Sequence, residues 1–87
     1  MIVYDVVFKG RVQGVGFRYT ARDLARASGI TGRVKNCPDG SVSLLVEGPE
    51  EAVRAMLDCL KGQFAVRDML VTSLPLSGRY TDFTVEY

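Results

Sequence analysis

The residues most able to do chemistry lie near the N-terminus, in the stretch GRVQGVGFR at residues 10–18. Its glycines, Gly10, Gly14 and Gly16, separate an apolar segment from a segment with helical spacing. A glycine-rich loop that leads into a helix directs backbone N–H groups toward one point, where the helix dipole adds positive potential. Such a loop can bind an anion such as phosphate. Glycine clusters also form tight turns without a ligand, so the loop alone leaves both interpretations open.

Arg18 would place a fixed positive charge in the first turn of that helix. A planar guanidinium donates two parallel hydrogen bonds to phosphate oxygens, a geometry that lysine does not reproduce. Because the helix dipole disfavours a basic residue at a helix start, we expect Arg18 to have a negatively charged partner. The alternative interpretation is a solvated surface charge.

Asn36 is the second candidate, just ahead of the turn sequence Pro38-Asp39-Gly40. Its neutral amide carries both a donor and an acceptor, so it can hold a water molecule in line with a breaking bond without taking the water's proton. The alternative is a residue that only caps the turn.

Other nucleotide-binding and RNA-binding loops fit poorly. The Walker pattern ends in Gly-Lys-Ser or Gly-Lys-Thr, and a dinucleotide fingerprint needs an acidic residue about 20 positions downstream, where Asn36 stands instead. Residues 14–17 faintly echo an RNA-recognition signature, but that signature belongs on a strand rather than in a strand-to-helix loop.

The elements that must position these residues follow from hydrophobic spacing and turn chemistry. We expect strands at residues 2–8, 31–37, 41–47, 66–74 and 82–86, and helices at 17–28 and 49–62 that end at Gly29 and Gly62. Tyr4, Phe8 and Phe83 are predicted to lie in the core. This β-α-β-β-α-β order with a short C-terminal strand predicts an α+β, ferredoxin-like split βαβ fold, with two helices on one face of an antiparallel sheet.

Composition restricts the remaining possibilities. A length of 87 residues predicts a single domain over residues 1–87. The net charge of +1 is too small to attract the protein to nucleic acid or to an anionic membrane. The chain has no histidine, which excludes a histidine general base. Cys37 and Cys59 are too sparse for a disulfide framework and are expected to be bystanders. No apolar run approaches a membrane span, so we expect a cytoplasmic protein.

The two motifs together resemble the acylphosphatase family. Residues 10–18 resemble its signature loop and residues 32–40 (GRVKNCPDG) its second motif, at the family's separation and in a chain of similar length. Some positions depart from the family pattern: Arg33 replaces an aromatic residue, Gln63-Phe64 stands where proline is frequent, and Glu86 occupies a place that is often basic.

The resemblance implies hydrolysis of acyl phosphates, with Arg18 and Asn36 as catalytic residues. We also expect a monomer without a cofactor, and the chemistry of an acyl phosphate requires no metal ion. The resemblance also implies a phosphate site built from the backbone amides of a run of loop residues together with the Arg18 side chain; these loop residues are Gln13, Gly14, Val15, Gly16 and Phe17. Two alternatives remain. One is a non-catalytic ferredoxin-like module that binds a ligand or RNA. The other is the acylphosphatase-like domain of a hydrogenase maturation factor that handles carbamoyl phosphate.

Overall fold

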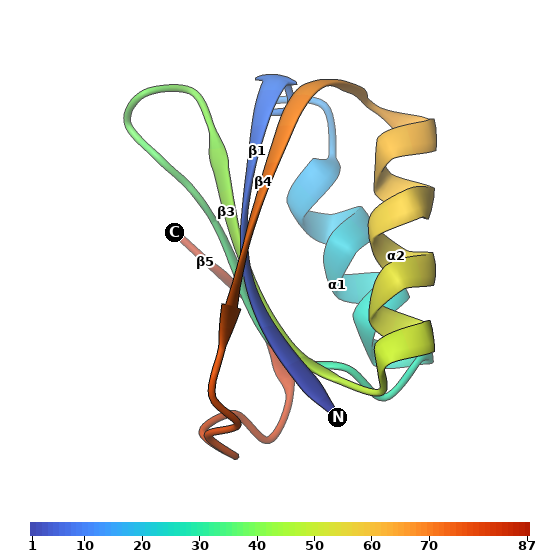
Figure 1. The fold of residues 1–87 in the computed structure, drawn as a ribbon. Coiled ribbons are helices and arrows are strands. Elements are labelled where there is room, and N and C mark those ends of the chain that lie inside the picture. The colour runs from blue at the N-terminus through green and yellow to red at the C-terminus, as the bar shows by residue number, and fades with distance from the viewer.

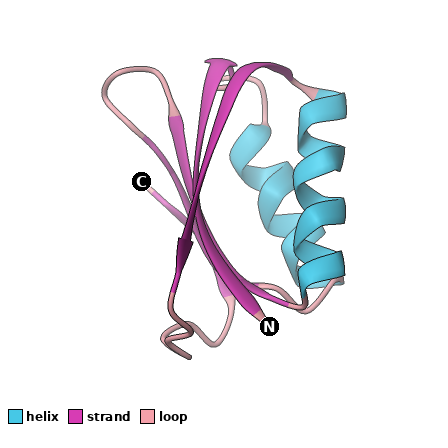
Figure 2. Cartoon of the chain, in the orientation of Figure 1, coloured by secondary structure: helices cyan, strands magenta, loops and turns pink.

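The computed structural model describes all residues from Met1 to Tyr87, and its helices lie together on one face of a single sheet (Figures 1 and 2). The elements, in chain order, are β1 (Ile2–Arg11), α1 (Phe17–Ala27), β2 (Thr31–Asn36), β3 (Val42–Gly48), α2 (Glu50–Gln63), β4 (Ala65–Leu74) and β5 (Phe83–Glu86). Every predicted element is present, with its ends shifted by a few residues at most.

The strands are arranged in the order β4-β1-β3-β2-β5. β1 pairs antiparallel with both β3 and β4, and β2 pairs antiparallel with β3. This confirms the predicted ferredoxin-like split βαβ fold. The expected antiparallel pairing holds for the first four strands, whereas β5 runs parallel to β2, which makes the sheet mixed.

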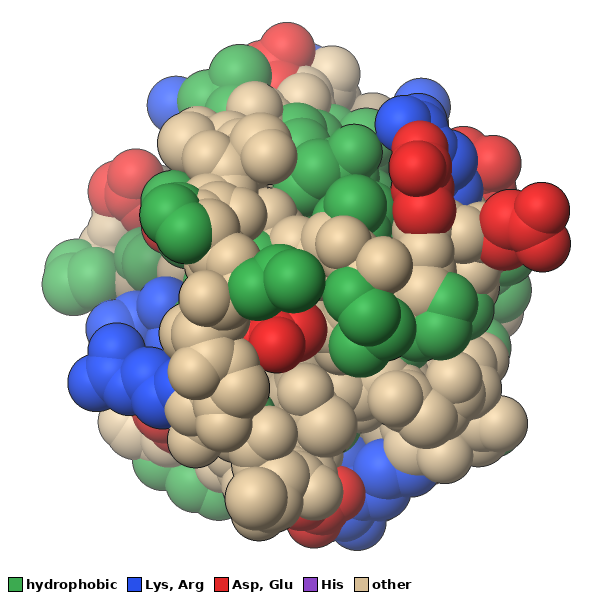
Figure 3. Space-filling view, turned by 60° about the horizontal axis from the view of Figure 1, so that its bottom comes forward, with side chains coloured by type: hydrophobic (Ala, Val, Ile, Leu, Met, Phe, Trp, Pro, Cys, Tyr) green, Lys and Arg blue, Asp and Glu red, His purple; other side chains and the backbone are tan.

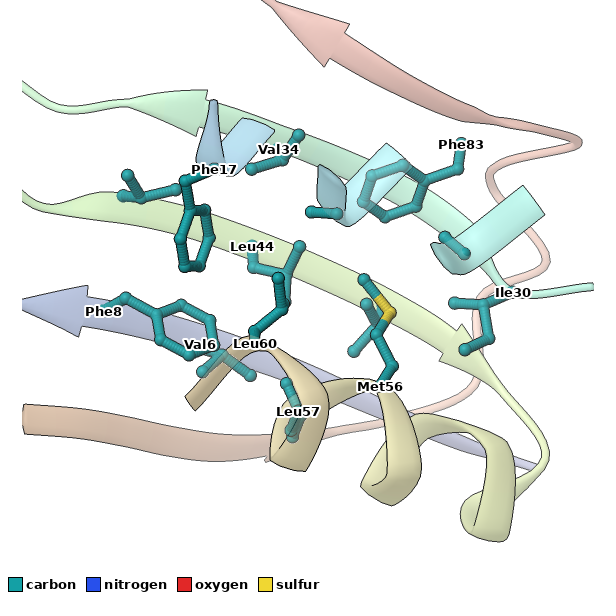
Figure 4. Packing of buried hydrophobic residues seen from close by; sticks show 14 of the residues in the cluster. Val6, Phe8, Phe17, Ile30, Val34, Leu44, Met56, Leu57, Leu60 and Phe83 are labelled. Atoms are coloured by element: carbon teal, nitrogen blue, oxygen red, sulfur yellow. The ribbon is translucent and has the colours of Figure 1, made fainter. Parts of the chain in front are cut away.

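The core fills the space between the sheet and the helices (Figure 4). Val6 and Phe8 alternate along β1 with less buried neighbours, as expected for a strand with one covered face. Phe17, Ala21 and Ala25 form the buried stripe of α1 at helical spacing. Two of these three residues are alanines, so α1 lies close to the sheet.

The ends of the helices differ in how the chain terminates them. Gly29, predicted to end the first helix, follows α1 with φ 69°, in the left-handed region that glycine adopts readily. Gly62, predicted to end α2, lies inside the helix, which continues to Gln63. The terminating residue is Phe64, which is extended and places its ring 5.0 Å from that of Phe17. Phe64 is partly buried against the core at the point where the chain leaves α2.

The outer surface carries charges of both signs. Acidic and basic side chains both occur on the face shown in Figure 3, with hydrophobic side chains between them. None of the helices is long and apolar enough to cross a membrane. Tyr4, predicted in the core, is half-buried and packs against the edge of the core, whereas Phe8 and Phe83 are fully buried.

Candidate active site

The loop between β1 and α1 is held at both of its ends by buried side chains. Val12 and Phe17 are each only 1% exposed. The Phe17 ring lies 4.9 Å from that of Phe8, which ties the first residue of α1 to strand β1. Between these anchors, Gly14 and Gly16 have φ values of 72° and 85°, in the left-handed region that glycine adopts without steric cost. The loop geometry thus follows directly from its glycines.

The loop and the first turn of α1 present unused hydrogen-bond donors. No backbone amide from residue 13 to residue 19 donates to an acceptor within the protein, and the first amide of this region to do so is Thr20 N–H, to the carbonyl of Gly16 at 3.1 Å. Gly16 occupies the N-cap position, where it has no side chain to cap the helix. The free amides at the positive end of the helix dipole therefore stay available to an anion.

Arg18 adds a full positive charge, and no carboxylate neutralises it. Its Nη1 donates to the main-chain oxygen of Glu86 at 3.3 Å, and its guanidinium carbon lies 5.0 Å from the ring centroid of Tyr87. Both partners are neutral groups. The negative partner expected for Arg18 is therefore not a protein side chain.

Asn36 is the last residue of β2 and shares the helix-covered face of the sheet with the buried Val34. Its Oδ1 is enclosed and accepts no hydrogen bond. Leaving a buried carbonyl oxygen unpaired costs about 1–3 kcal/mol, so such an atom is rarely retained without a role. The amide is therefore not acting as a cap of the following turn.

These groups meet at one hollow of about 160 Å³, which we call the loop hollow; it is lined by Val12, Gly14, Gly16, Phe17, Arg18, Tyr19 and Asn36. Predicted site residues from both motifs are thus brought together. Two predicted residues, Gln13 and Val15, are not among those that line it. Val15 is instead 42% exposed beside it.

The Gln13 side chain has a different task. Its Nε2 donates to the main-chain oxygens of Cys37 and Ser41, both at 2.8 Å. Each hydrogen of the amide thus holds one carbonyl of the β2–β3 turn. Gln13 therefore links the loop that carries the free amides to the hairpin that carries Asn36. The sequence shows no signal for this link, because its ends are far apart along the chain.

Sequence reasoning also missed Tyr19, which lines the loop hollow, and Tyr87, which stacks on Arg18. The two phenol groups are hydrogen-bonded to each other. This hydrogen bond raises the pKa of Tyr87 above its ordinary value, an effect that nearby Arg18 partly opposes. Tyr19 follows Arg18 directly in the first helical turn, and that position was the available signal.

Comparison with known proteins decides the family. The acylphosphatase family model matches residues 4–85. The chain belongs to the acylphosphatase family. An acylphosphatase of Bacillus subtilis is 41% identical over 91 residues, a match that includes 100% of this chain and 99% of the relative. As a member of this family the chain is an enzyme of the hydrolase class.

Solved structures agree. The crystal structure of the Bacillus subtilis acylphosphatase superimposes with a TM-score of 0.92 at 38% identity, covering 100% of both chains. HypF of T. kodakarensis also matches, with a TM-score of 0.84 and 28% identity, but there the chain covers 12% of the structure. Free-standing acylphosphatases are therefore similar over their whole length, whereas HypF is similar over a small part of its own.

The departures from the family pattern all have structural partners. Arg33 donates from Nη1 to Oγ of Ser43 at 3.1 Å, across the β2–β3 pair. The Phe64 ring packs against the Phe17 ring at a tilt of 53°, and the main-chain oxygen of Glu86 accepts the hydrogen bond from Arg18. The third contact needs only the carbonyl of Glu86, so the type of side chain at that position does not affect it.

Proposed function

We propose that this acylphosphatase hydrolyses the bond between the phosphoryl group and the carboxyl oxygen of acyl phosphates, through a phosphate site made by Arg18 and the loop amides. The observation that carries the proposal is the unneutralised guanidinium of Arg18 at a hollow where the neighbouring amides are free. An anion with several oxygens can use all these donors at once. A phosphoryl group meets that description.

In the proposed reaction, a water oxygen forms a bond to phosphorus as the bond from phosphorus to the carboxyl oxygen breaks. The electron pair of the broken bond leaves with the carboxylate, and the water's proton passes to a phosphoryl oxygen. A carboxylate is stable once released, because the acid it forms has a pKa near 4. The reaction therefore needs no strong general acid, which suits a site without histidine.

Stabilisation of charge supplies most of the catalysis in this scheme. During phosphoryl transfer the charge is spread over the equatorial oxygens, and preorganised donors there lower the barrier without reorganising. Arg18 and the free amides of residues 13–17 are the donors that we assign to this task. The scheme includes no metal ion, because the positive charge comes from the guanidinium and the helix dipole.

Asn36 is assigned to the attacking water. Its Oδ1 is unpaired within the protein, and its side chain lines the same hollow as Arg18. Rotation of the amide about its last torsion exchanges oxygen and nitrogen, so the group can offer the water an acceptor or a donor. Holding the water in line converts a bimolecular encounter into a reaction within one complex.

The RNA-binding alternative would need an exposed aromatic side chain in the loop on which a base could stack. Phe17, the aromatic residue of the faint RNA-recognition echo, is 1% exposed and packs on Phe8, so it has no free face for a base. We propose further that the protein is a monomer, that it acts in the cytoplasm and that its substrates are small acyl phosphates.

The test is hydrolysis of benzoyl phosphate in the presence of a chelator, by the wild type beside Arg18→Gln and the control Arg67→Gln. Circular dichroism checks that all three are folded. We expect the Arg18 variant to lose about 100- to 1,000-fold in kcat/KM and the control to retain wild-type activity. Loss of activity by unfolding of Arg18→Gln, or equal rates for all three proteins, would overturn the assignment. No turnover by the folded wild type would contradict the function itself.

A further inference from the structure

Apart from Met1, the large apolar and aromatic side chains that are exposed on this protein fall into two groups. One group follows β4 and the segment after it: Leu70, Val71, Leu74 and Leu76. The other group is Val15, Tyr19 and Tyr87, which we call the rim group. Tyr19 lines the loop hollow and Val15 lies between two glycines that line it, so the rim group borders the candidate active site.

Tyr19 is exposed but is held in place. The guanidinium carbon of Arg22 lies 5.1 Å from its ring centroid, and its hydroxyl group is hydrogen-bonded to that of Tyr87. Arg22 is itself paired with Asp23 at 3.0 Å. The ring is thus tied through one face and through its hydroxyl group, while 42% of the residue remains exposed. A ligand that packs on it does not have to immobilise it first.

The loop hollow is small for a whole substrate. Its volume of about 160 Å³ corresponds to roughly five water molecules at about 30 Å³ each. A phosphoryl group and its attacking water fill most of that space. The remainder of an acyl phosphate, beyond the carboxyl oxygen, must therefore extend over the rim, where Tyr19 directly follows the phosphate-binding Arg18.

We propose that the Tyr19 ring forms the subsite for the acyl group and favours flat, apolar acyl groups over small ones. This inference rests on the proposed function. An aromatic acyl group can stack against the edge or open face of the Tyr19 ring, a contact that acetyl makes only weakly. The exposed Tyr19 ring extends the apolar surface that Val12 and Phe17 contribute to the hollow.

The test compares benzoyl phosphate with acetyl phosphate as the ratio of their kcat/KM values. Tyr19→Ser removes the ring, Tyr19→Phe keeps it, and Leu70→Ser is a matched control that removes an exposed apolar side chain from the other group. We expect the ratio to fall about threefold to tenfold in Tyr19→Ser and to stay within about twofold of the wild type in the other two. An unchanged ratio in Tyr19→Ser, or an equal fall in Leu70→Ser, would overturn the subsite. Should Tyr19→Ser fail to fold, Tyr19→Leu removes the flat ring and keeps the apolar bulk.

A binding measurement separates the subsite from the proposed function. Phenylphosphonate and methylphosphonate carry the same charged head and are not hydrolysed. We expect the wild type to bind the phenyl compound more tightly, and we expect Tyr19→Ser to lose about the same factor as in the kinetic ratio. A preference for phenyl in a protein that hydrolyses neither substrate would support the subsite and contradict the function. Equal affinities in an active wild type would contradict the subsite alone.

Discussion

Two hollows lie beside the β2–β3 turn, and they differ in how many of their polar groups are hydrogen-bonded within the protein. The larger, which we call the turn hollow, has a volume of about 220 Å³ and is lined by Lys9, Gly10, Asp39, Gly40, Ser41 and Arg67. Asp39 accepts hydrogen bonds from the Ser41 hydroxyl group at 2.6 Å and from its amide at 3.0 Å. Arg67 is paired with Asp68 at 3.0 Å. The turn hollow therefore satisfies most of its own charges.

The loop hollow is smaller, at about 160 Å³, and several of its polar groups have no partner within the protein. Arg18 has no carboxylate partner, the nearby amides have no acceptors, and Oδ1 of Asn36 has no donor. The comparison teaches that size does not identify the site. What distinguishes the loop hollow is a set of polar groups whose hydrogen bonds are not all made within the protein.

Among the substitutions that test this difference between the two hollows, we expect Asn36→Ala to have the largest effect on activity. Removal of the amide should lower kcat about 100-fold, roughly 2.7 kcal/mol of barrier, with a smaller change in KM, because the lost group positions water rather than substrate. Steady-state kinetics with benzoyl phosphate measures both constants. The control is Lys35→Ala on the neighbouring exposed residue, which should change neither. A change in KM alone would reassign Asn36 to substrate binding.

A smaller effect is expected from Gln13→Ala, which cuts the link between the loop and the hairpin. Loss of the two hydrogen bonds to the turn frees the loop amides relative to Asn36, so kcat should fall about tenfold, and the free energy of unfolding by about 1–2 kcal/mol. Steady-state kinetics measures the change in kcat, and urea unfolding measures the change in the free energy of unfolding. Gln63→Ala, which removes an amide bonded to Cys59 on the surface of α2, is the matched control. If both variants lose stability equally and neither loses activity, the link has no catalytic role.

The smallest effect concerns the turn hollow and is a dependence on pH. Hydrogen bonds from Ser41 lower the pKa of Asp39 below its ordinary value. A lowered pKa in the folded state contributes stability that is present at neutral pH and lost as the pH falls through the folded-state pKa. Ser41→Ala should therefore be less stable than the wild type at pH 7, and the difference should shrink below about pH 4.

Activity provides the second readout for Ser41→Ala. Gln13 binds the main-chain carbonyl of Ser41, which the substitution keeps. Turnover of benzoyl phosphate at pH 7 should therefore be unchanged. A stability difference that stays constant down to pH 2 would contradict the role given to Asp39, and a large loss of turnover would mean that the turn hollow takes part in the reaction.

The fold was predictable because its signals are local. Alternation along β1, the helical stripe of α1 and the Pro38-Asp39-Gly40 turn each act over a few residues. The parallel pairing of β5 with β2 was not predictable, because the spacing of apolar residues within a strand carries no information about the direction of the neighbouring strand. The prediction that α2 ends at Gly62 was wrong for a related reason. The helix continues to Gln63, and Phe64, the residue that leaves it, packs on Phe17, which is distant in the sequence.

The candidate site was predictable in its motif residues and not in its supports. Arg18 and Asn36 were found by residue type and motif, and the structure places both at one hollow. The Gln13 link joins residues 24 and 28 positions apart, and the contact between Arg18 and Glu86 joins residues 68 positions apart. Contacts over such separations depend on the packing of the whole sheet.

Calorimetric titration of inorganic phosphate into the wild type, Arg18→Gln and Arg67→Gln tests the central claim most directly, since each variant removes one arginine from one hollow. We predict that the wild type and Arg67→Gln bind one phosphate with the same affinity and that Arg18→Gln binds at least about tenfold more weakly, because a hydrogen bond to a charged group is worth about 1.5–3 kcal/mol. Weakened binding in Arg67→Gln with unchanged binding in Arg18→Gln would contradict the claim and place the anion in the turn hollow.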